Sequence, residues 1–136
     1  MKPGHYIDAN VFVYAALSRD AKGKSARKIL ARIRDGTLQG YTSITTTDEI
    51  MWAVQKESGR EDALLAASSM LAITKLFILP VNFEVAQKAL HVYRATNLRP
   101  RDSFHVAMMR VFDIPTLISE DKDFDKIEGI KRIGLT

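Results

Sequence analysis

Carboxylate side chains stand at four places in the sequence where an expected strand ends or an expected helix begins. They are Asp8, Glu49, Asp102 and the pair Asp121 and Asp123. Taken singly, Asp8 suits a helix N-cap and Asp102 suits the first helical turn, where a negative charge is favoured. Glu49 fits a capping box that opens at Thr46. In one crevice, however, these acids would repel each other strongly unless cations neutralised them or some acids took up protons.

A shared site of oxygen ligands would suit Mg²⁺ or Mn²⁺. Such an ion lowers the pKa of a bound water, and two ions about 4 Å apart stabilise both oxygens of an in-line phosphoryl displacement. The shared site therefore predicts phosphodiester hydrolysis. A calcium loop opening at Asp121 is excluded, because Lys126 and Arg132 stand where glycine and glutamate are required. Zinc is not expected, because the chain has no cysteine and its three histidines are scattered.

Other residues near these motifs have ordinary structural interpretations. His105 follows Asp102 by three residues on one expected helix and could point toward the crevice, although we expect a histidine packed and hydrogen-bonded inside the domain. Trp52 is expected in the core or on a dimer surface rather than as a platform for base stacking. Met108 and Met109 are expected to pack as ordinary helix residues.

The elements that must position the acids are strands alternating with helices. We expect strands over residues 5–7, 38–43, 77–81, 116–118 and 130–136, the third of them buried and the last at a sheet edge. We expect helices over residues 11–17, 26–35, 48–54, 63–76, 83–95 and 100–111. Ser25 is the expected N-cap of the second helix, and Gly36 its C-terminal glycine. Pro100 suits the first turn of the last helix.

This alternation predicts an α/β fold of three layers, α/β/α, around a mainly parallel sheet of four to five strands. A chain of 136 residues predicts one domain, spanning 1–136. No run reaches the ~20 apolar residues that cross a bilayer, and the first residues lack the apolar segment of a signal peptide. Together with the absence of cysteine, this predicts a soluble cytoplasmic protein. The formal charge of +4 mildly favours an anionic partner such as nucleic acid.

Four segments, in order along nearly the whole chain, resemble the motifs of PIN-domain ribonucleases, and most closely the VapC toxins of type II toxin–antitoxin pairs. These segments are Tyr6–Val11, Thr47–Ile50, Arg101–Ala107 and Ile118–Phe124. The resemblance implies a PIN-like fold and an endoribonuclease that depends on Mg²⁺ or Mn²⁺. It also implies a structured RNA substrate, a homodimer, and a VapB-type antitoxin whose tail occupies the groove beside the acids.

The resemblance further implies roles for individual residues. Four acids would bind metal: Asp8, Glu49, Asp102 and Asp121. Asn10 and Ser119 would be supporting polar residues, and Asp123 an additional or alternative ligand, with Asp121 favoured as the fourth acid. Basic residues near the expected site loops are candidates for binding the RNA backbone, with a solvated surface role as the alternative: Arg99, Arg101, Lys122 and Lys24.

Three other functions stay open from the residues. A housekeeping RNA-processing nuclease could use the same fold and the same acids. A non-catalytic RNA- or protein-binding module would use the acids only as caps and crevice polarity. A phosphatase with Asp8 as an aspartyl nucleophile is a weaker alternative, because Asn10 stands where that turn has its second acid.

Overall fold

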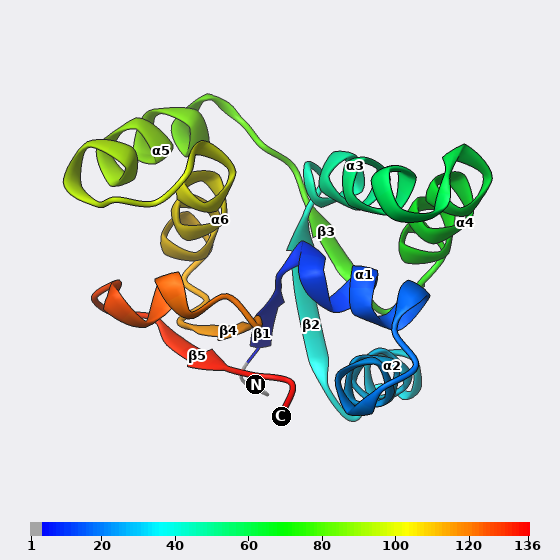
Figure 1. Ribbon diagram of the computed structural model, residues 1–136. Helices are drawn as coiled ribbons and strands as arrows, with labels where there is room; N and C mark the ends of the chain where they lie inside the picture. Colours follow the sequence, from blue (N-terminus) through cyan, green and yellow to red (C-terminus); the bar gives the residue numbers. More distant parts are fainter. Residues whose placement is uncertain (1–3) are drawn as a thin grey trace.

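The computed structural model describes residues 4–136 and contains a five-stranded sheet in the order β3-β2-β1-β4-β5. The strands are β1 (Gly4–Ile7), β2 (Gln39–Ser43), β3 (Phe77–Leu79), β4 (Thr116–Ile118) and β5 (Lys131–Ile133). Every neighbouring pair runs parallel, so the carboxyl ends of all five strands lie at one edge of the sheet. The central strand β1 pairs with β2 on one side and β4 on the other, and the chain order reverses there (Figure 1).

Helices cover both faces of this sheet (Figure 1). They are α1 (Ala9–Leu17), α2 (Ala21–Asp35), α3 (Thr46–Ser58), α4 (Arg60–Leu71), α5 (Phe83–Ala95) and α6 (Pro100–Val111), followed by the short 3-10 helix η1 (Lys122–Lys126). Side chains of β1 alternate between two cores: Ile7 packs with residues of α1 to α4, and Tyr6 packs with residues of α5 and α6. The predicted three-layer α/β/α fold with a parallel sheet is therefore confirmed.

Side-chain caps start several of these helices. Asp20 accepts a hydrogen bond from the backbone N–H of Gly23 and begins α2, and Asn82 does the same for α5. The expected N-cap at Ser25 is wrong, because the N-cap is Asp20, five residues earlier, and α2 begins at Ala21. Its first turn is polar and therefore invisible to apolar periodicity. At the other end, Gly36 adopts φ 84°, as expected of a C-terminal glycine.

Two further boundaries differ from the sequence prediction. The helix expected over residues 63–76 is Arg60–Leu71, and Leu76 is buried beyond its end. The apolar pattern extends the predicted helix to Leu76 because this residue is buried, although it packs from the loop after α4. The third strand was expected to be buried, but β3 lies at the edge of the sheet and leaves Phe77 51% exposed. The final strand lies at the opposite edge, as predicted.

Met108, Met109 and Trp52 differ in burial. Met108 and Met109 are buried in the core, which confirms their packing role. Trp52 is 59% exposed, so the core alternative is wrong and the dimer-surface alternative stays a prediction. Within residues 4–136, no helix combines the length and apolar character needed to cross a membrane.

Candidate metal centre

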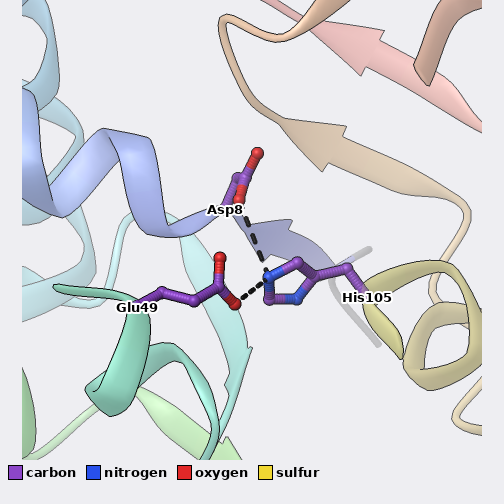
Figure 2. Close-up of side chains that lie close together, drawn as sticks. All are labelled: Asp8, Glu49 and His105. Atoms are coloured by element: carbon purple, nitrogen blue, oxygen red, sulfur yellow. Dashed lines mark ion pairs between the residues drawn. The ribbon is translucent and has the colours of Figure 1, made fainter. Parts of the chain in front are cut away.

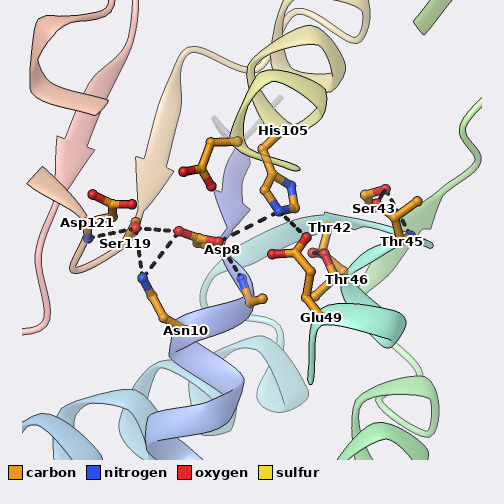
Figure 3. Close-up of polar contacts among 12 residues, drawn as sticks. Asp8, Asn10, Thr42, Ser43, Thr45, Thr46, Glu49, His105, Ser119 and Asp121 are labelled. Carbon is orange, nitrogen blue, oxygen red and sulfur yellow. Dashed lines mark hydrogen bonds and ion pairs between the residues drawn. The ribbon is translucent and has the colours of Figure 1, made fainter. Parts of the chain in front are cut away.

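The predicted acids meet at the carboxyl edge of the sheet, on both sides of β1 (Figure 3). Asp8 directly follows β1, and Glu49 lies at the start of α3, after β2. Asp102 lies in the first turn of α6, and Asp121 follows β4. Because parallel strands end at the same edge, residues more than a hundred positions apart in sequence face the same space.

Asp8 serves both as a helix cap and as the centre of this polar group. Its Oδ1 accepts a hydrogen bond of 2.7 Å from the Ala9 backbone N–H, which confirms the N-cap interpretation. Its Oδ2 accepts hydrogen bonds from Ser119 Oγ at 2.6 Å and Asn10 Nδ2 at 3.3 Å. Burial raises the pKa of Asp8, although His105 and Ser119 oppose this effect. A buried carboxylate of this kind is stabilised by a nearby cation.

Asn10 and Ser119 tie the start of α1 to the loop after β4. Asn10 Nδ2 also donates to Ser119 Oγ at 3.1 Å, and the Asn10 side-chain oxygen accepts from the Glu120 N–H at 3.4 Å. Ser119 Oγ in turn accepts from the Asp121 N–H at 3.0 Å. These bonds connect the segments that carry Asp8 and Asp121, and the supporting role of Asn10 and Ser119 stays a prediction.

Glu49 does not form the capping box that the sequence suggested. The N-cap of α3 is Thr45, which makes no side-chain capping bond, so Glu49 stands one position too far into the helix. Its carboxylate points instead toward His105 (Figure 2). Thr42 Oγ1 donates to the Ile7 carbonyl at 2.8 Å and contacts Thr46 Oγ1, which holds the start of α3 against β1.

His105 extends from α6 into the space between Asp8 and Glu49 (Figure 2). Its Nδ1 lies 2.6 Å from the Tyr6 hydroxyl, so the prediction of a packed, hydrogen-bonded histidine is confirmed. Its Nε2 lies 2.6 Å from Glu49 Oε1 and 3.8 Å from Asp8 Oδ1. The Nε2 contact has the distance of an ion pair but not the alignment of a hydrogen bond. The ring therefore also takes part in the acidic group.

The charge of His105 depends on its acidic neighbours. Burial alone would lower the pKa of the imidazole, but the carboxylates of Glu49, Asp8 and Asp102 outweigh it and raise the pKa to about 9. The ring is therefore cationic at neutral pH and offsets part of the negative charge around it. Sequence reasoning placed His105 on the correct helix but gave it no electrostatic role.

Asp102 and Asp121 are bridged by a single arginine. Arg99 Nη2 lies 3.4 Å from Asp102 Oδ2 and 3.3 Å from Asp121 Oδ2. Burial and the nearby charge of Asp8 raise the pKa of Asp102 to about 6, although His105 and Arg99 oppose the rise. Asp121 Oδ1 accepts from the Asp123 N–H at 2.9 Å and caps η1, whereas the Asp123 side chain is exposed.

The donor set fits a divalent cation. Carboxylate oxygens of Asp8 and Glu49 lie within 4.8 Å of each other and of His105 Nε2, which can serve as a ligand only after the ring loses its proton. Asp102 and Asp121 join this group through Arg99 and Ser119. Carboxylate oxygens suit Mg²⁺ or Mn²⁺, and burial disfavours the ionised forms of Asp8 and Asp102, which a bound cation would stabilise.

The other basic candidates differ in whether they lie beside the acids. Arg101 pairs with Asp48 at 3.1 Å, which joins the starts of α6 and α3 beside the acids. Lys122 is exposed on η1, next to Asp121. Lys24 is exposed on α2, and its side chain forms no ion pair with any of residues 4–136. The structure thus brings Arg99 to the acids but not Lys24.

Comparison with known proteins agrees with this fold. The family model of the PIN domain matches residues 5–130, and the chain belongs to the PIN domain family. It is similar to the Mycobacterium tuberculosis protein named ribonuclease VapC13, with 28% identity over 131 residues that cover 94% of this chain and 98% of the relative.

Two solved structures share the fold. One is the Mycobacterium tuberculosis toxin VapC20, described as cleaving the sarcin–ricin loop, with a TM-score of 0.74 and 19% identity over 90% of this chain and 93% of that one. The other comes from a toxin–antitoxin complex of Klebsiella pneumoniae, with a TM-score of 0.67 and 18% identity over 94% of this chain and 96% of that one. At these identities the likeness establishes the fold.

Proposed function

We propose that this PIN-domain protein is an endoribonuclease that depends on Mg²⁺ or Mn²⁺ and acts as the toxin of a toxin–antitoxin pair. The observation that carries the proposal is the convergence of Asp8, Glu49 and Asp121 at the carboxyl edge of β1, with Asp102 linked to Asp121 by Arg99. The relative named as a ribonuclease aligns with nearly the whole chain, which supports RNA as the substrate.

In this proposal the four acids hold the divalent cation, which supplies charge stabilisation and lowers the pKa of water. Ser119 and Asn10 keep the Asp8 carboxylate oriented through the bonds to its Oδ2. Asp123 supports the loop of Asp121 by donating its N–H, and its side chain remains a candidate for an additional ligand. Arg99, Arg101 and Lys122 surround the centre with positive charge suited to a phosphate backbone.

The decisive experiment is cleavage of total RNA by purified protein free of antitoxin. We expect fragments with Mg²⁺ or Mn²⁺, none with EDTA, and a loss of at least ~100-fold in rate for Asp8→Asn. The matched control is Asp125→Asn. This substitution changes an exposed carboxylate of η1 that pairs with Arg132 of β5, and it leaves the four proposed metal-binding acids unchanged. Intact RNA in the presence of both metals, or full activity of Asp8→Asn, contradicts the proposal.

The proposed partners are an antitoxin and a second copy of this chain. A VapB-type antitoxin is proposed because a structural neighbour comes from a toxin–antitoxin complex. A homodimer is proposed because the sequence resembles the VapC toxins. Light scattering of the purified protein tests the dimer. Coexpression with the small protein of the adjacent reading frame tests the antitoxin, because a true antitoxin copurifies and suppresses RNA cleavage. A lack of both effects would favour a housekeeping RNA-processing nuclease.

One observation also favours a non-catalytic binding module. Asp8 caps α1 and Asp121 caps η1, as expected if the acids had only structural roles. Calorimetric titration with Mn²⁺ separates the two functions, because capping acids alone create no cation site. We expect a binding site that disappears in Asp102→Asn, since Asp102 makes no capping bond with its own helix. Absence of any Mn²⁺ binding would favour the module.

A further inference from the structure

We propose that Arg99 exchanges partners during the reaction: it bridges Asp102 and Asp121 while no divalent cation is bound, and it binds an RNA phosphate once the cation is present. This inference rests on the proposed nuclease function. Its starting point is the placement of one guanidinium nitrogen within 3.4 Å of oxygens from both acids, which belong to different segments of the chain.

The bridge satisfies a charge requirement that a metal ion would satisfy better. Asp102 is buried, and a buried carboxylate needs a positive neighbour when it is ionised. Arg99 supplies one positive charge to Asp102 and Asp121 together. A divalent cation held by the same carboxylates supplies twice that charge and repels the guanidinium. Cation binding therefore weakens the contacts that hold Arg99 at the acids.

The geometry of Arg99 allows its side chain to leave while its backbone stays fixed. Arg99 is the N-cap residue of α6, and its carbonyl accepts hydrogen bonds from both the Ser103 N–H at 2.9 Å and Ser103 Oγ at 3.0 Å. The side chain, in contrast, is 74% exposed. The guanidinium can thus turn outward about a fixed point beside the centre, without any change in α6.

A phosphodiester is the chemically suited second partner. The planar guanidinium donates two parallel hydrogen bonds to phosphate oxygens, a geometry that a lysine ammonium does not reproduce. The substrate phosphate must approach the same acids that the cation occupies, so it arrives within reach of the released side chain. Arg99 would then bind substrate only in the cation-loaded protein, which couples RNA affinity to the presence of metal.

Arg101 provides a matched control. It lies two residues away in the first turn of the same helix, its side chain is 51% exposed, and it also forms an ion pair. Its partner, however, is Asp48, an exposed acid outside the central group. Arg101→Gln removes the same charge from the same turn without freeing Asp102 or Asp121. The comparison of the two variants therefore separates the effect of losing the Arg99 contacts with Asp102 and Asp121 from the effect of losing one positive charge.

The first test is titration of the RNA-free protein with Mn²⁺ by calorimetry. Arg99→Gln is expected to bind Mn²⁺ at least about 5-fold more tightly than the wild type, which is the lower end of usual coupling between two ligands. Arg99→Lys, which keeps the charge, and Arg101→Gln are expected to stay close to the wild type. Unchanged or weaker Mn²⁺ binding by Arg99→Gln overturns the exchange.

The second test measures binding of a fluorescent single-stranded RNA by anisotropy, with Ca²⁺ or with EDTA, and checks on a gel that the RNA stays uncut. With Ca²⁺, Arg99→Gln is expected to weaken binding and reduce the salt slope by about one. With EDTA it is expected to bind like the wild type. An equal loss of RNA affinity with Ca²⁺ and with EDTA overturns the exchange. In the first test, a wild-type protein that binds no Mn²⁺ overturns the proposed metal centre itself.

Discussion

Replacing Asp102 by asparagine is expected to stabilise the metal-free protein while it removes a proposed metal ligand. The pKa of Asp102 rises from 3.8 to about 6 on folding, because burial and the Asp8 charge disfavour the ionised carboxylate. The folded protein therefore binds this proton more tightly than the unfolded chain, and the free energy of unfolding falls as pH rises from about 4 to 6. Each pKa unit corresponds to about 1.4 kcal/mol, so the fall amounts to ~3 kcal/mol.

Asparagine has nearly the same shape and never ionises, so Asp102→Asn should lack this fall. We expect the variant and the wild type to have equal stability below pH 4, and the variant to be more stable by ~3 kcal/mol at pH 8. Urea unfolding in EDTA at both pH values measures the difference. This gain is a large fraction of the 5–15 kcal/mol that usually stabilises a domain.

The control for this experiment is Asp125→Asn. The bond with Arg132 lowers the pKa of Asp125, so this substitution is expected to change the stability at pH 8 in the opposite direction. The reasoning is refuted if Asp102→Asn is less stable than the wild type at pH 8, or if its gain is the same at pH 4 and pH 8. Either result would mean that Asp102 is not an electrostatic burden in the metal-free site.

Three further predictions concern the surroundings of the acids. Tyr6→Phe removes the buried hydroxyl that contacts His105 Nδ1 and should lower the free energy of unfolding by ~1–3 kcal/mol in urea titrations. The pKa of His105 is raised to about 9, so the stability that its charge contributes is present below pH 6.5 and is lost between pH 6.5 and 9. In His105→Gln the free energy of unfolding should no longer fall over this pH range, which urea unfolding at several pH values measures. Gly23→Ala should destabilise the protein by ~1–3 kcal/mol in thermal or urea unfolding, although alanine usually stabilises a helix, because its Cβ would lie 2.0 Å from the Ser18 carbonyl oxygen. A more stable Gly23→Ala variant would contradict that packing.

The order and type of the elements were predictable because their signals are local. Apolar spacing gave α5 at its observed bounds, Phe83–Ala95, and Pro100 marked the first residue of α6. The misplaced start of α2 has a physical cause that the pattern does not contain. Its first turn packs against the Ser18 backbone through Gly23, a contact between residues that show no apolar periodicity. The edge position of β3 likewise depends on strand order, which local patterns do not encode.

The candidate site was predictable as far as its acids. Their positions after strands and at helix starts placed Asp8, Glu49, Asp102 and Asp121 at one edge of the sheet. The sequence did not show that His105 would carry a positive charge among them, because this depends on distances to Glu49 and Asp8. Nor could it show the Arg99 bridge, since Asp121 lies 22 residues from Arg99 in sequence and reaches it only in the folded chain.

The central position of β1 also determines when the site can exist during synthesis. Asp8 and Glu49 belong to the half of the sheet that the ribosome produces first, whereas Asp102, His105 and Asp121 belong to the half produced last. A nascent chain that ends at α4 can build neither the Arg99 bridge nor the complete group of acids. If the proposed nuclease activity is correct, the growing chain cannot cut the ribosome or the message that is producing it.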